Sequence, residues 1–127
     1  MPEPVWVRDE VVLAIHHRQL SEHGGLDGVR DVGLLQSALA RPRNLGAYSN
    51  ESDLAALAAA YAFGISRNHP FIDGNKRTAL VVCETFLNLN GLFLQAPREE
   101  RYLTFLNLAD GSLSEEELAA WIRQRLK

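Results

Sequence analysis

Apolar residues recur every three or four positions along most of the chain, and strand-like alternation is short wherever it occurs. This pattern predicts helices separated by turn-forming residues. The predicted helices cover residues 9–23, 31–41, 53–69, 73–90, 97–110 and 114–125. We therefore expect an all-α fold, a compact bundle of about six helices that forms a single domain over residues 1–127.

Capping residues mark several of the predicted helix boundaries. Asp31 and Asp53 each precede an apolar-periodic run and are typical N-caps. Ser114 and Glu117 have the spacing of a capping box, in which each side chain satisfies a backbone N–H group of the other residue. These signals fix where three of the helices begin.

The second helix is expected to stop before Pro42, because proline cannot donate a backbone hydrogen bond inside a helix. The following segment, Arg41–Ser52, is rich in turn-forming residues. We expect it to form a short flap, either a loop or a small hairpin.

The fourth helix is apolar almost all round, which is typical of a central, buried helix. Its main face carries Ala79, Val82, Cys83, Phe86 and Leu87. Cys83 is the only cysteine of the chain, so no internal disulfide can form.

The overall composition excludes several classes of function. The chain has 127 residues, 46% of them hydrophobic, and a net charge of -3. Proteins that bind nucleic acid directly or lie on an anionic membrane are usually strongly basic, so we expect neither partner. The N-terminal stretch lacks a basic segment followed by an apolar run, and we expect no signal peptide and a cytoplasmic location.

The candidate chemistry is concentrated in residues 68–77, NHPFIDGNKR. Pro70 bends the chain between the third and fourth helices, so these residues surround a helix N-terminus. The first N–H groups of a helix lack internal partners and, with the helix dipole, favour an anion such as phosphate. Gly74 lets a ligand approach the backbone closely. The segment therefore predicts a phosphate site.

Two cations stand in the first turn of the fourth helix, where the helix dipole disfavours them by about 0.3–1 kcal/mol each. Lys76 and Arg77 would gain rather than lose stability if a polyphosphate were bound beside them. Asn75 could donate a hydrogen bond to a phosphate oxygen. Asp73 offers hard oxygen ligands for Mg²⁺, which commonly binds one or two carboxylates together with substrate phosphates.

His69 is the candidate base, because an imidazole readily takes a proton from an attacking hydroxyl near neutral pH. Each residue also has a simpler interpretation on its own: Asp73 as an N-cap, Asn68 as a cap of the preceding helix, and His69 as a surface histidine. The joint spacing favours phosphoryl or nucleotidyl transfer. His16, on an apolar face, is expected to be a satisfied core histidine.

The string HPFIDGNKRTAL resembles the signature of the Fic/Doc family, matching at His69, Pro70, Phe71 and every residue from Asp73 to Arg77. The segments GGLDGVRDVGLLQSALARPR and FLNLNG also resemble the death-on-curing, or Doc-type, toxins of toxin–antitoxin pairs. The resemblance covers about residues 10–95.

This resemblance implies a compact helical bundle that binds ATP and Mg²⁺. It assigns His69 as the base toward a target hydroxyl and Asp73 as the metal ligand. Gly74, Asn75 and Arg77 would bind phosphate, and we place Asn68, Phe71 and Lys76 with them around the nucleotide. The loop Arg41–Ser52 would correspond to the flap that aligns the target segment.

Lys76 bears on the choice between two chemistries. Members that transfer AMP usually carry a second glycine at this position, whereas Doc-type toxins carry lysine and resemble kinases of a threonine in elongation factor Tu. A lysine there would fill the space needed by one end of ATP, so the nucleotide would bind reversed and present its γ-phosphate. Gly74 and Pro70, however, follow the Fic pattern, and AMP transfer stays an alternative.

The resemblance also implies a partner. Many Fic proteins are restrained by an internal motif, (S/T)xxxE(G/N), and SLSEEE at residues 112–117 is not a good copy of it. Restraint is then expected from a separate, Phd-like antitoxin. Two further alternatives are a nucleotide-binding module without turnover and a metal-dependent hydrolase, the latter lacking a third ligand at suitable spacing.

Overall fold

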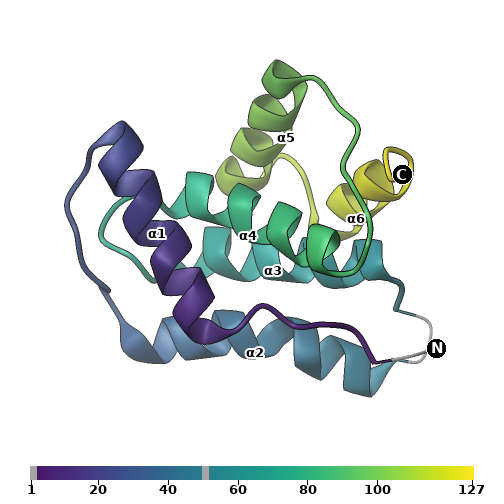
Figure 1. The fold of residues 1–127 in the computed structure, drawn as a ribbon, viewed down its shortest axis with the longest axis horizontal. Helices are drawn as coiled ribbons and strands as arrows, with labels where there is room; N and C mark the ends of the chain where they lie inside the picture. Colours follow the sequence, from purple (N-terminus) through teal and green to yellow (C-terminus); the bar gives the residue numbers. More distant parts are fainter. Residues whose placement is uncertain (1–2, 50–51) are drawn as a thin grey trace.

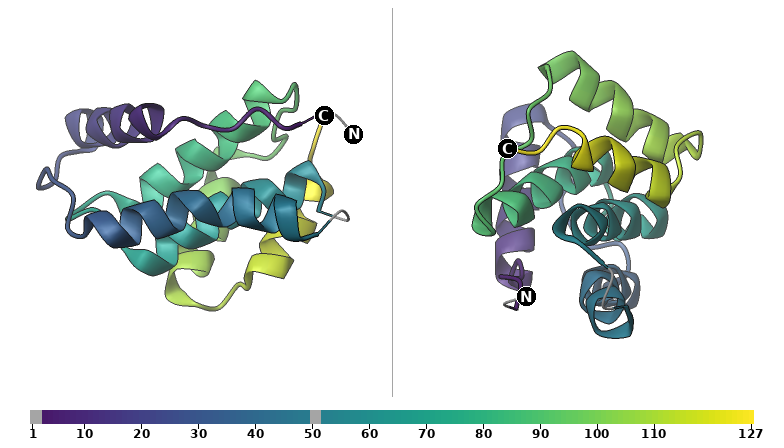
Figure 2. Two further views of the ribbon diagram at one scale, coloured as in Figure 1. Left: turned by 90° about the horizontal axis from the view of Figure 1, so that it is seen from below. Right: turned by 90° about the vertical axis from the view of Figure 1, so that its right-hand side faces the viewer.

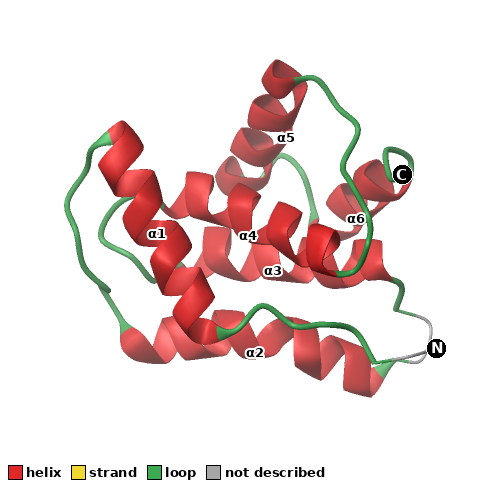
Figure 3. Cartoon of the chain, in the orientation of Figure 1, coloured by secondary structure: helices red, strands yellow, loops and turns green. Residues whose placement is uncertain are grey.

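The computed structural model describes residues 3–49 and 52–127, which form six α-helices (Figure 1). Two short stretches lie outside the described residues. They are residues 1–2, at the N-terminus where no signal peptide was expected, and Asn50–Glu51, within the predicted flap. The helices are α1 (Asp9–His23), α2 (Val32–Tyr48), α3 (Leu54–Asn68), α4 (Asn75–Leu89), α5 (Arg98–Asp110) and α6 (Glu115–Arg123). The helical colouring of Figure 3 confirms the predicted all-α class for the part of the chain that is described.

Helix α3 forms the centre of the bundle, with α4 beside it. Helices α2, α4 and α6 pack against α3, and α1 crosses α4 on the outside (Figures 1 and 2). Ten of the fifteen residues of α3 are buried, many of them alanines that let neighbouring helices approach. The short connection from Asn68 to Asn75 makes α3 and α4 antiparallel and places the motif residues at one end of this central pair.

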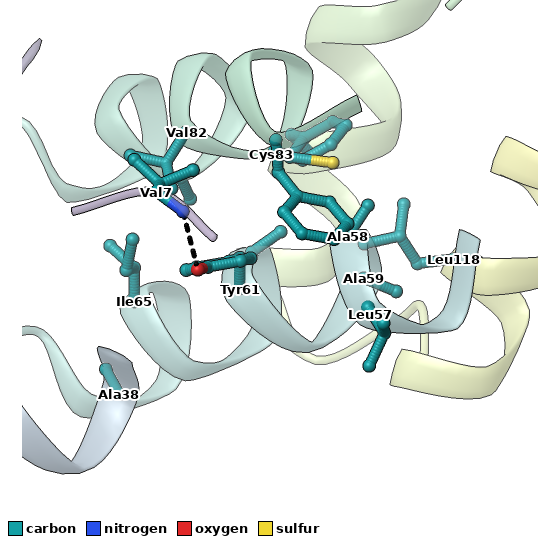
Figure 4. Packing of buried hydrophobic residues seen from close by; sticks show 14 of the residues in the cluster. Val7, Ala38, Leu57, Ala58, Ala59, Tyr61, Ile65, Val82, Cys83 and Leu118 are labelled. Atoms are coloured by element: carbon teal, nitrogen blue, oxygen red, sulfur yellow. Dashed lines mark hydrogen bonds between the residues drawn. The ribbon is translucent and has the colours of Figure 1, made fainter. Parts of the chain in front are cut away.

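The core lies between α3 and α4 and is closed by the N-terminal segment (Figure 4). Tyr61 is 1% exposed, and its hydroxyl accepts a hydrogen bond from the backbone of Val7 at 3.1 Å. Burial raises the pKa of the Tyr61 hydroxyl. Cys83 is fully buried in the same core, where burial raises the pKa of the thiol. This agrees with the prediction that Cys83 lies on the main face of a buried helix.

Capping signals read from the sequence are confirmed at three helix starts. The carboxylate of Asp31 accepts from the N–H of Leu34 at 2.9 Å, and that of Asp53 accepts from Ala56 at 2.9 Å. Ser114 and Glu117 form both hydrogen bonds of the predicted capping box. These local patterns determine helix starts because they depend only on neighbouring residues.

The predicted end of the second helix was wrong, since α2 runs through Pro42 to Tyr48. A proline inside a helix costs about 3 kcal/mol, so its surroundings must offset that cost. Pro42 is buried, and Leu35, Leu39 and Leu45 continue the same stripe against the core. This stripe extends past the proline at helical spacing and is the signal that favours continuation.

Close packing of α2 on α3 depends on Gly64. A Cβ atom at this position would lie 3.1 Å from both the Cα atom and the carbonyl oxygen of Ala38. Ala38 is the residue whose carbonyl would have received the missing N–H of Pro42. The absence of a side chain at Gly64 therefore lets the two backbones approach and supports the helix through the proline.

The two ends of the described chain are attached to the bundle by hydrogen bonds of their backbone groups. The backbone of Val5 exchanges hydrogen bonds with the side-chain amide of Asn90. Phe93 and Lys127 exchange two backbone hydrogen bonds, which bring the C-terminal residues against the α4–α5 connection. Among the described helices none has the length and apolar character needed to cross a membrane.

Candidate active site

The motif residues lie in the connection between α3 and α4, and both ends of this connection have left-handed backbone. His69 is the C-cap of α3 with φ 49° and ψ 54°, and Gly74 is the N-cap of α4 with φ 81°. Glycine adopts this conformation freely, whereas another residue pays about 1–2 kcal/mol for it. His69 is the one non-glycine residue with positive φ in residues 3–49 and 52–127. A strained residue of this kind persists only where its surroundings hold it.

The segment 24–31, between α1 and α2, pairs with the motif connection. Ile72 donates its N–H to the carbonyl of Gly28 at 3.0 Å, and Val29 and Phe71 form an isolated antiparallel bridge. The flap was predicted over Arg41–Ser52, and this was wrong for its described part, which is helical to Tyr48. The backbone pairing beside the motif comes from 24–31 instead, because α2 carries residues 41–48 away along α3.

Helix α1 contacts the connection between α3 and α4 through His16. The His16 ring is 4% exposed and stacks on Phe71, with ring centroids 3.7 Å apart and an interplanar angle of 9°. Its Nε2 lies 2.8 Å from the carbonyl oxygen of Asp73. A carbonyl can only accept, so Nε2 carries a proton. The prediction of a satisfied core histidine is confirmed.

Phe71 is fully buried and anchors the connection in the core. It was predicted to lie around the nucleotide, but it is not among the residues that line the cavity at the start of α4. Its backbone is held by the side chain of Asn75. Phe71 therefore anchors the connection between α3 and α4 to the core.

The side-chain amide of Asn75 is used entirely inside the protein. Oδ1 accepts from the N–H of Phe71 at 3.0 Å, and Nδ2 donates to the carbonyl of Phe71 at 2.9 Å. The same Nδ2 lies 3.2 Å from Nδ1 of His69. Since the two bonds to Phe71 fix which way the amide points, Nδ1 of His69 is the acceptor. A phosphate could therefore meet only the backbone N–H of Asn75, not its side chain.

A cavity of about 220 Å³ opens over the start of α4. It is lined by His69, Ile72, Asp73, Gly74, Asn75, Lys76, Arg77 and Tyr102. The side chains of Lys76 and Arg77 are exposed, and neither forms a salt bridge with a described carboxylate. Unpaired cations beside a helix N-terminus are the electrostatic setting that favours a bound polyanion.

The backbone of α4 adds further donors to this cavity. The first N–H group of the helix with a described acceptor is that of Thr78, which bonds to the carbonyl of Gly74 at 3.0 Å. The N–H groups of Asn75, Lys76 and Arg77 have no acceptor within the described part of the chain. Three free donors in one turn match the oxygens of a phosphate group.

Asp73 lies at the edge of the same cavity, and its predicted alternative role as an N-cap was wrong. Gly74 takes the N-cap position of α4, and α4 has no side-chain cap. Oδ2 of Asp73 instead accepts from the N–H of Leu26 at 2.8 Å. Oδ1 has no described donor and is the oxygen available to a metal ion.

The donor set fits a magnesium ion that is shared with a phosphate. No group of three or more His, Cys, Asp or Glu side chains in residues 3–49 and 52–127 is arranged to hold a metal. Mg²⁺ commonly keeps several waters and is bound through one or two carboxylates together with substrate phosphates. A single oxygen of Asp73 beside a phosphate site is consistent with that mode.

Asn68 is separated from the other predicted site residues. Its Nδ2 donates to the carbonyl of Leu34 in α2 at 3.0 Å. The side chain lines a different cavity of about 390 Å³, between α2, α3 and the start of α6. Tyr102 of α5, by contrast, lines the motif cavity and was missed, because its position on that helix gives no signal of distant neighbours.

Residues 6–87 match the model of the Fic/DOC family. The chain belongs to the Fic/DOC family. It is 33% identical over 118 residues to the protein called "Protein kinase doc" of Escherichia phage P1, with 93% of each chain covered. It is 46% identical over 77 residues to "Toxin Doc" of Mycolicibacterium smegmatis, covering 58% of this chain and 57% of that one.

Proposed function

We propose that this Fic/DOC protein is the toxin of a bacterial toxin–antitoxin pair. In this proposal it acts as a kinase that transfers the γ-phosphate of ATP to a Thr or Ser hydroxyl of a protein such as elongation factor Tu, and so blocks translation. The names of its two relatives, a protein kinase and a toxin, support both halves of this proposal. The observation that carries it is the arrangement of His69 beside three free N–H groups, Lys76 and Arg77 around one cavity.

In the transfer step the target hydroxyl oxygen forms a bond to the γ-phosphorus, and the bond from that phosphorus to the bridging oxygen breaks. ADP leaves, and the hydroxyl proton goes to His69. Lys76, Arg77 and the N–H groups at the start of α4 hold the phosphate charge during the transfer. The residues thus act by positioning and by neutralising charge.

Two features of the ring of His69 bear on proton transfer. Nδ1 accepts from Asn75 at a distance of 3.2 Å, which is at the long end for a hydrogen bond. The neutral ring therefore carries its proton on Nε2. An incoming hydroxyl either displaces Asn75 from Nδ1 or is met after the ring proton has moved from Nε2 to Nδ1.

Magnesium would be held by Oδ1 of Asp73 together with phosphate oxygens. When bound, the ion neutralises phosphate charge and orients the transferring group. Asp73 itself is oriented by the N–H of Leu26 on Oδ2 and by the contact of His16 with its carbonyl. These two contacts restrict the orientation of the Asp73 carboxylate and therefore the position of Oδ1.

The size of the cavity suits the phosphate end of a nucleotide in either orientation, and the proposed reversed orientation rests on Lys76. Ligand pockets that enclose a whole drug-sized molecule measure about 300–1,000 Å³. At about 220 Å³, this cavity fits the phosphate end of ATP with the nucleoside over the surface outside. Lys76 stands on its wall, where it takes space next to the phosphates and pairs with their charge.

The decisive experiment incubates the protein with elongation factor Tu and ATP labelled at the α or the γ phosphorus. We expect label from the γ position only and a mass increase of about 80, whereas AMP transfer would add roughly 329 and carry the α label, because each mass follows from the phosphorus attacked. Transfer of α label alone would overturn the kinase proposal. Binding of ATP with no modified product would favour a non-catalytic binding module.

A second experiment tests the toxin role in cells. Expression of the protein alone should arrest growth, and His69→Ala should relieve the arrest while the protein still folds, because His69 is exposed. Co-expression of a Phd-like antitoxin, whose disordered tail would fold onto the toxin, should also relieve it. Arrest by the His69→Ala variant equal to that by the unchanged protein would remove His69 from the proposed mechanism.

A further inference from the structure

Arg30, which lies outside the cavity, binds the backbone of the motif at three successive carbonyl groups. Its Nη2 donates to the carbonyl of Asn68 at 2.8 Å, and its Nε donates to the carbonyl of His69 at 2.7 Å. Its own backbone N–H donates to the carbonyl of Pro70 at 2.7 Å. One residue thereby satisfies every carbonyl from the last residue of α3 to the bend.

Without Arg30, the carbonyls of Asn68 and His69 would have no donor in the described part of the chain, whereas that of Pro70 also accepts from the N–H of Asp31 at 3.2 Å. The last C=O groups of a helix have no internal donors, and they carry the negative end of the helix dipole. A guanidinium is suited to them, since its planar fork donates two parallel hydrogen bonds and its charge is favourable at a helix C-terminus. Arg30 therefore caps α3 from the segment 24–31, far away in sequence.

The same contacts hold His69 in its strained conformation. The left-handed backbone of His69 costs about 1–2 kcal/mol for a non-glycine residue. Nε of Arg30 donates to the carbonyl of His69 itself, and Nη2 donates to the carbonyl of Asn68, the residue before it. Rotation of His69 toward an ordinary conformation would move both carbonyls away from the fork.

We propose that Arg30 is a positioning residue for His69. By fixing the backbone of His69, it sets the direction of the imidazole, so that Nδ1 meets Asn75 and the opposite edge of the ring faces the cavity. This inference rests on the proposed role of His69 as base. Arg30 does not line the cavity, so it acts through the backbone that it binds, at the centre of which lies His69.

The first experiment reads the ring directly. In ¹⁵N-labelled protein above neutral pH, the long-range ¹H–¹⁵N correlations of His69, assigned with the His69→Ala variant, should show one tautomer protonated at Nε2. In Arg30→Lys, which keeps the charge but has no fork, the ring should lose its contact with Asn75 and show averaged Nδ1 and Nε2 signals. The control is Arg18→Gln, an exposed arginine that pairs only with Glu22 on α1.

The second experiment separates positioning from general destabilisation. We expect Arg30→Lys to lower kcat for phosphate transfer by about tenfold to a hundredfold, the size of effect that a misplacement of about 1 Å produces. The dissociation constant for ATP should stay within about twofold, since none of the phosphate-binding groups changes. Arg18→Gln should leave both quantities unchanged.

Two results would overturn the inference. One is an unchanged His69 spectrum in a folded Arg30→Lys protein. The other is a parallel loss of ATP affinity, kcat and stability, which is the result for a residue that only supports the fold. The His69 spectrum does not depend on turnover, so it tests the role of Arg30 even if the unchanged protein transfers no phosphate. The kinase proposal and the Arg30 proposal can therefore fail separately.

Discussion

Nδ2 of Asn75 lies 3.2 Å from Nδ1 of His69, while the same amide group is hydrogen-bonded to both backbone polar groups of Phe71. Asn75 thus links the candidate base to the residue that anchors the loop. Asn75 is 5% exposed and its amide group already makes these three contacts, so it stabilises the loop from inside the protein. The residue expected to donate to a phosphate instead contacts the ring of His69 with its side chain.

Replacing Asn75 by Asp should change the tautomer of His69. A carboxylate cannot donate, so Nδ1 would have to carry the proton and donate to it, leaving Nε2 with a free lone pair. The carbonyl of Phe71 would lose its donor, which we expect to lower the free energy of unfolding by about 1–3 kcal/mol. Urea denaturation gives the stability, and the ¹H–¹⁵N pattern of His69 gives the tautomer. A ring still protonated at Nε2 would contradict this account.

Gly74 and Gly91 offer a matched pair for separating backbone strain from function. Their φ angles are 81° and 80°, and a Cβ at Gly91 would meet nothing within 4 Å. A Cβ at Gly74 would lie 3.4 Å from Leu20 and 3.7 Å from His16, which are ordinary contacts. Alanine at either position should therefore cost about 1–2 kcal/mol through its left-handed backbone alone.

The two alanine variants should differ in phosphate binding. Gly74 lines the cavity at the N-terminus of α4, where relaxation of its left-handed backbone would move the free N–H groups, whereas Gly91 lies beyond the other end of that helix. Titration with ATP should show weaker binding for Gly74→Ala only. Equal ATP affinity in both variants, at equal loss of stability, would mean that Gly74 serves the turn and not the ligand.

A pair of substitutions separates the contributions of the two contacts that His16 makes. His16→Phe should keep the stacking on Phe71 and remove the donor to the Asp73 carbonyl, at a cost of about 0.5–1.5 kcal/mol. His16→Ala should lose both contacts and cost about 2–5 kcal/mol, as other deletions of large buried side chains do. Thermal unfolding measures both. A Phe variant as unstable as the Ala variant would show that the stacking contributes little.

The Asp53–Arg123 pair gives a pH-dependent contribution to stability. The hydrogen bond from the Arg123 guanidinium lowers the pKa of the Asp53 carboxyl below its ordinary value of 3.8, and the N–H of Ala56 lowers this pKa further. Its stabilisation is therefore present above about pH 4 and is lost as the pH falls through the folded-state pKa. Because the pair is about half exposed, its contribution should be below about 1 kcal/mol.

The measurement compares the unchanged protein with Asp53→Asn, which keeps an N-cap side chain but not the charge. The difference in free energy of unfolding should shrink as the pH falls from neutral toward the acidic limit of folding. Arg123→Gln should reproduce this behaviour, and the double variant should add little more. A difference that stays constant with pH would mean that the ion pair does not contribute.

Local patterns were enough to predict most of the secondary structure and the composition of the site. The N-caps at Asp31 and Asp53 and the capping box at Ser114 depend on residues within one turn, so they can be read directly. His69 and residues 72–77 of the motif also line one cavity, because a short connection between two helices leaves them no room to separate. Family membership follows from the same consecutive residues.

Long-range contacts were decided only when the chain folded. The stacking of His16 on Phe71, the hydrogen bonds of Arg30 at the end of α3 and the position of Tyr102 beside the motif join residues 25 or more positions apart, and no spacing in the sequence encodes them. The same holds for Pro42, where burial against α3 outweighed the local rule that proline ends a helix. Helix starts depend on nearby atoms, whereas the direction of the His69 ring depends on which distant surfaces pack together.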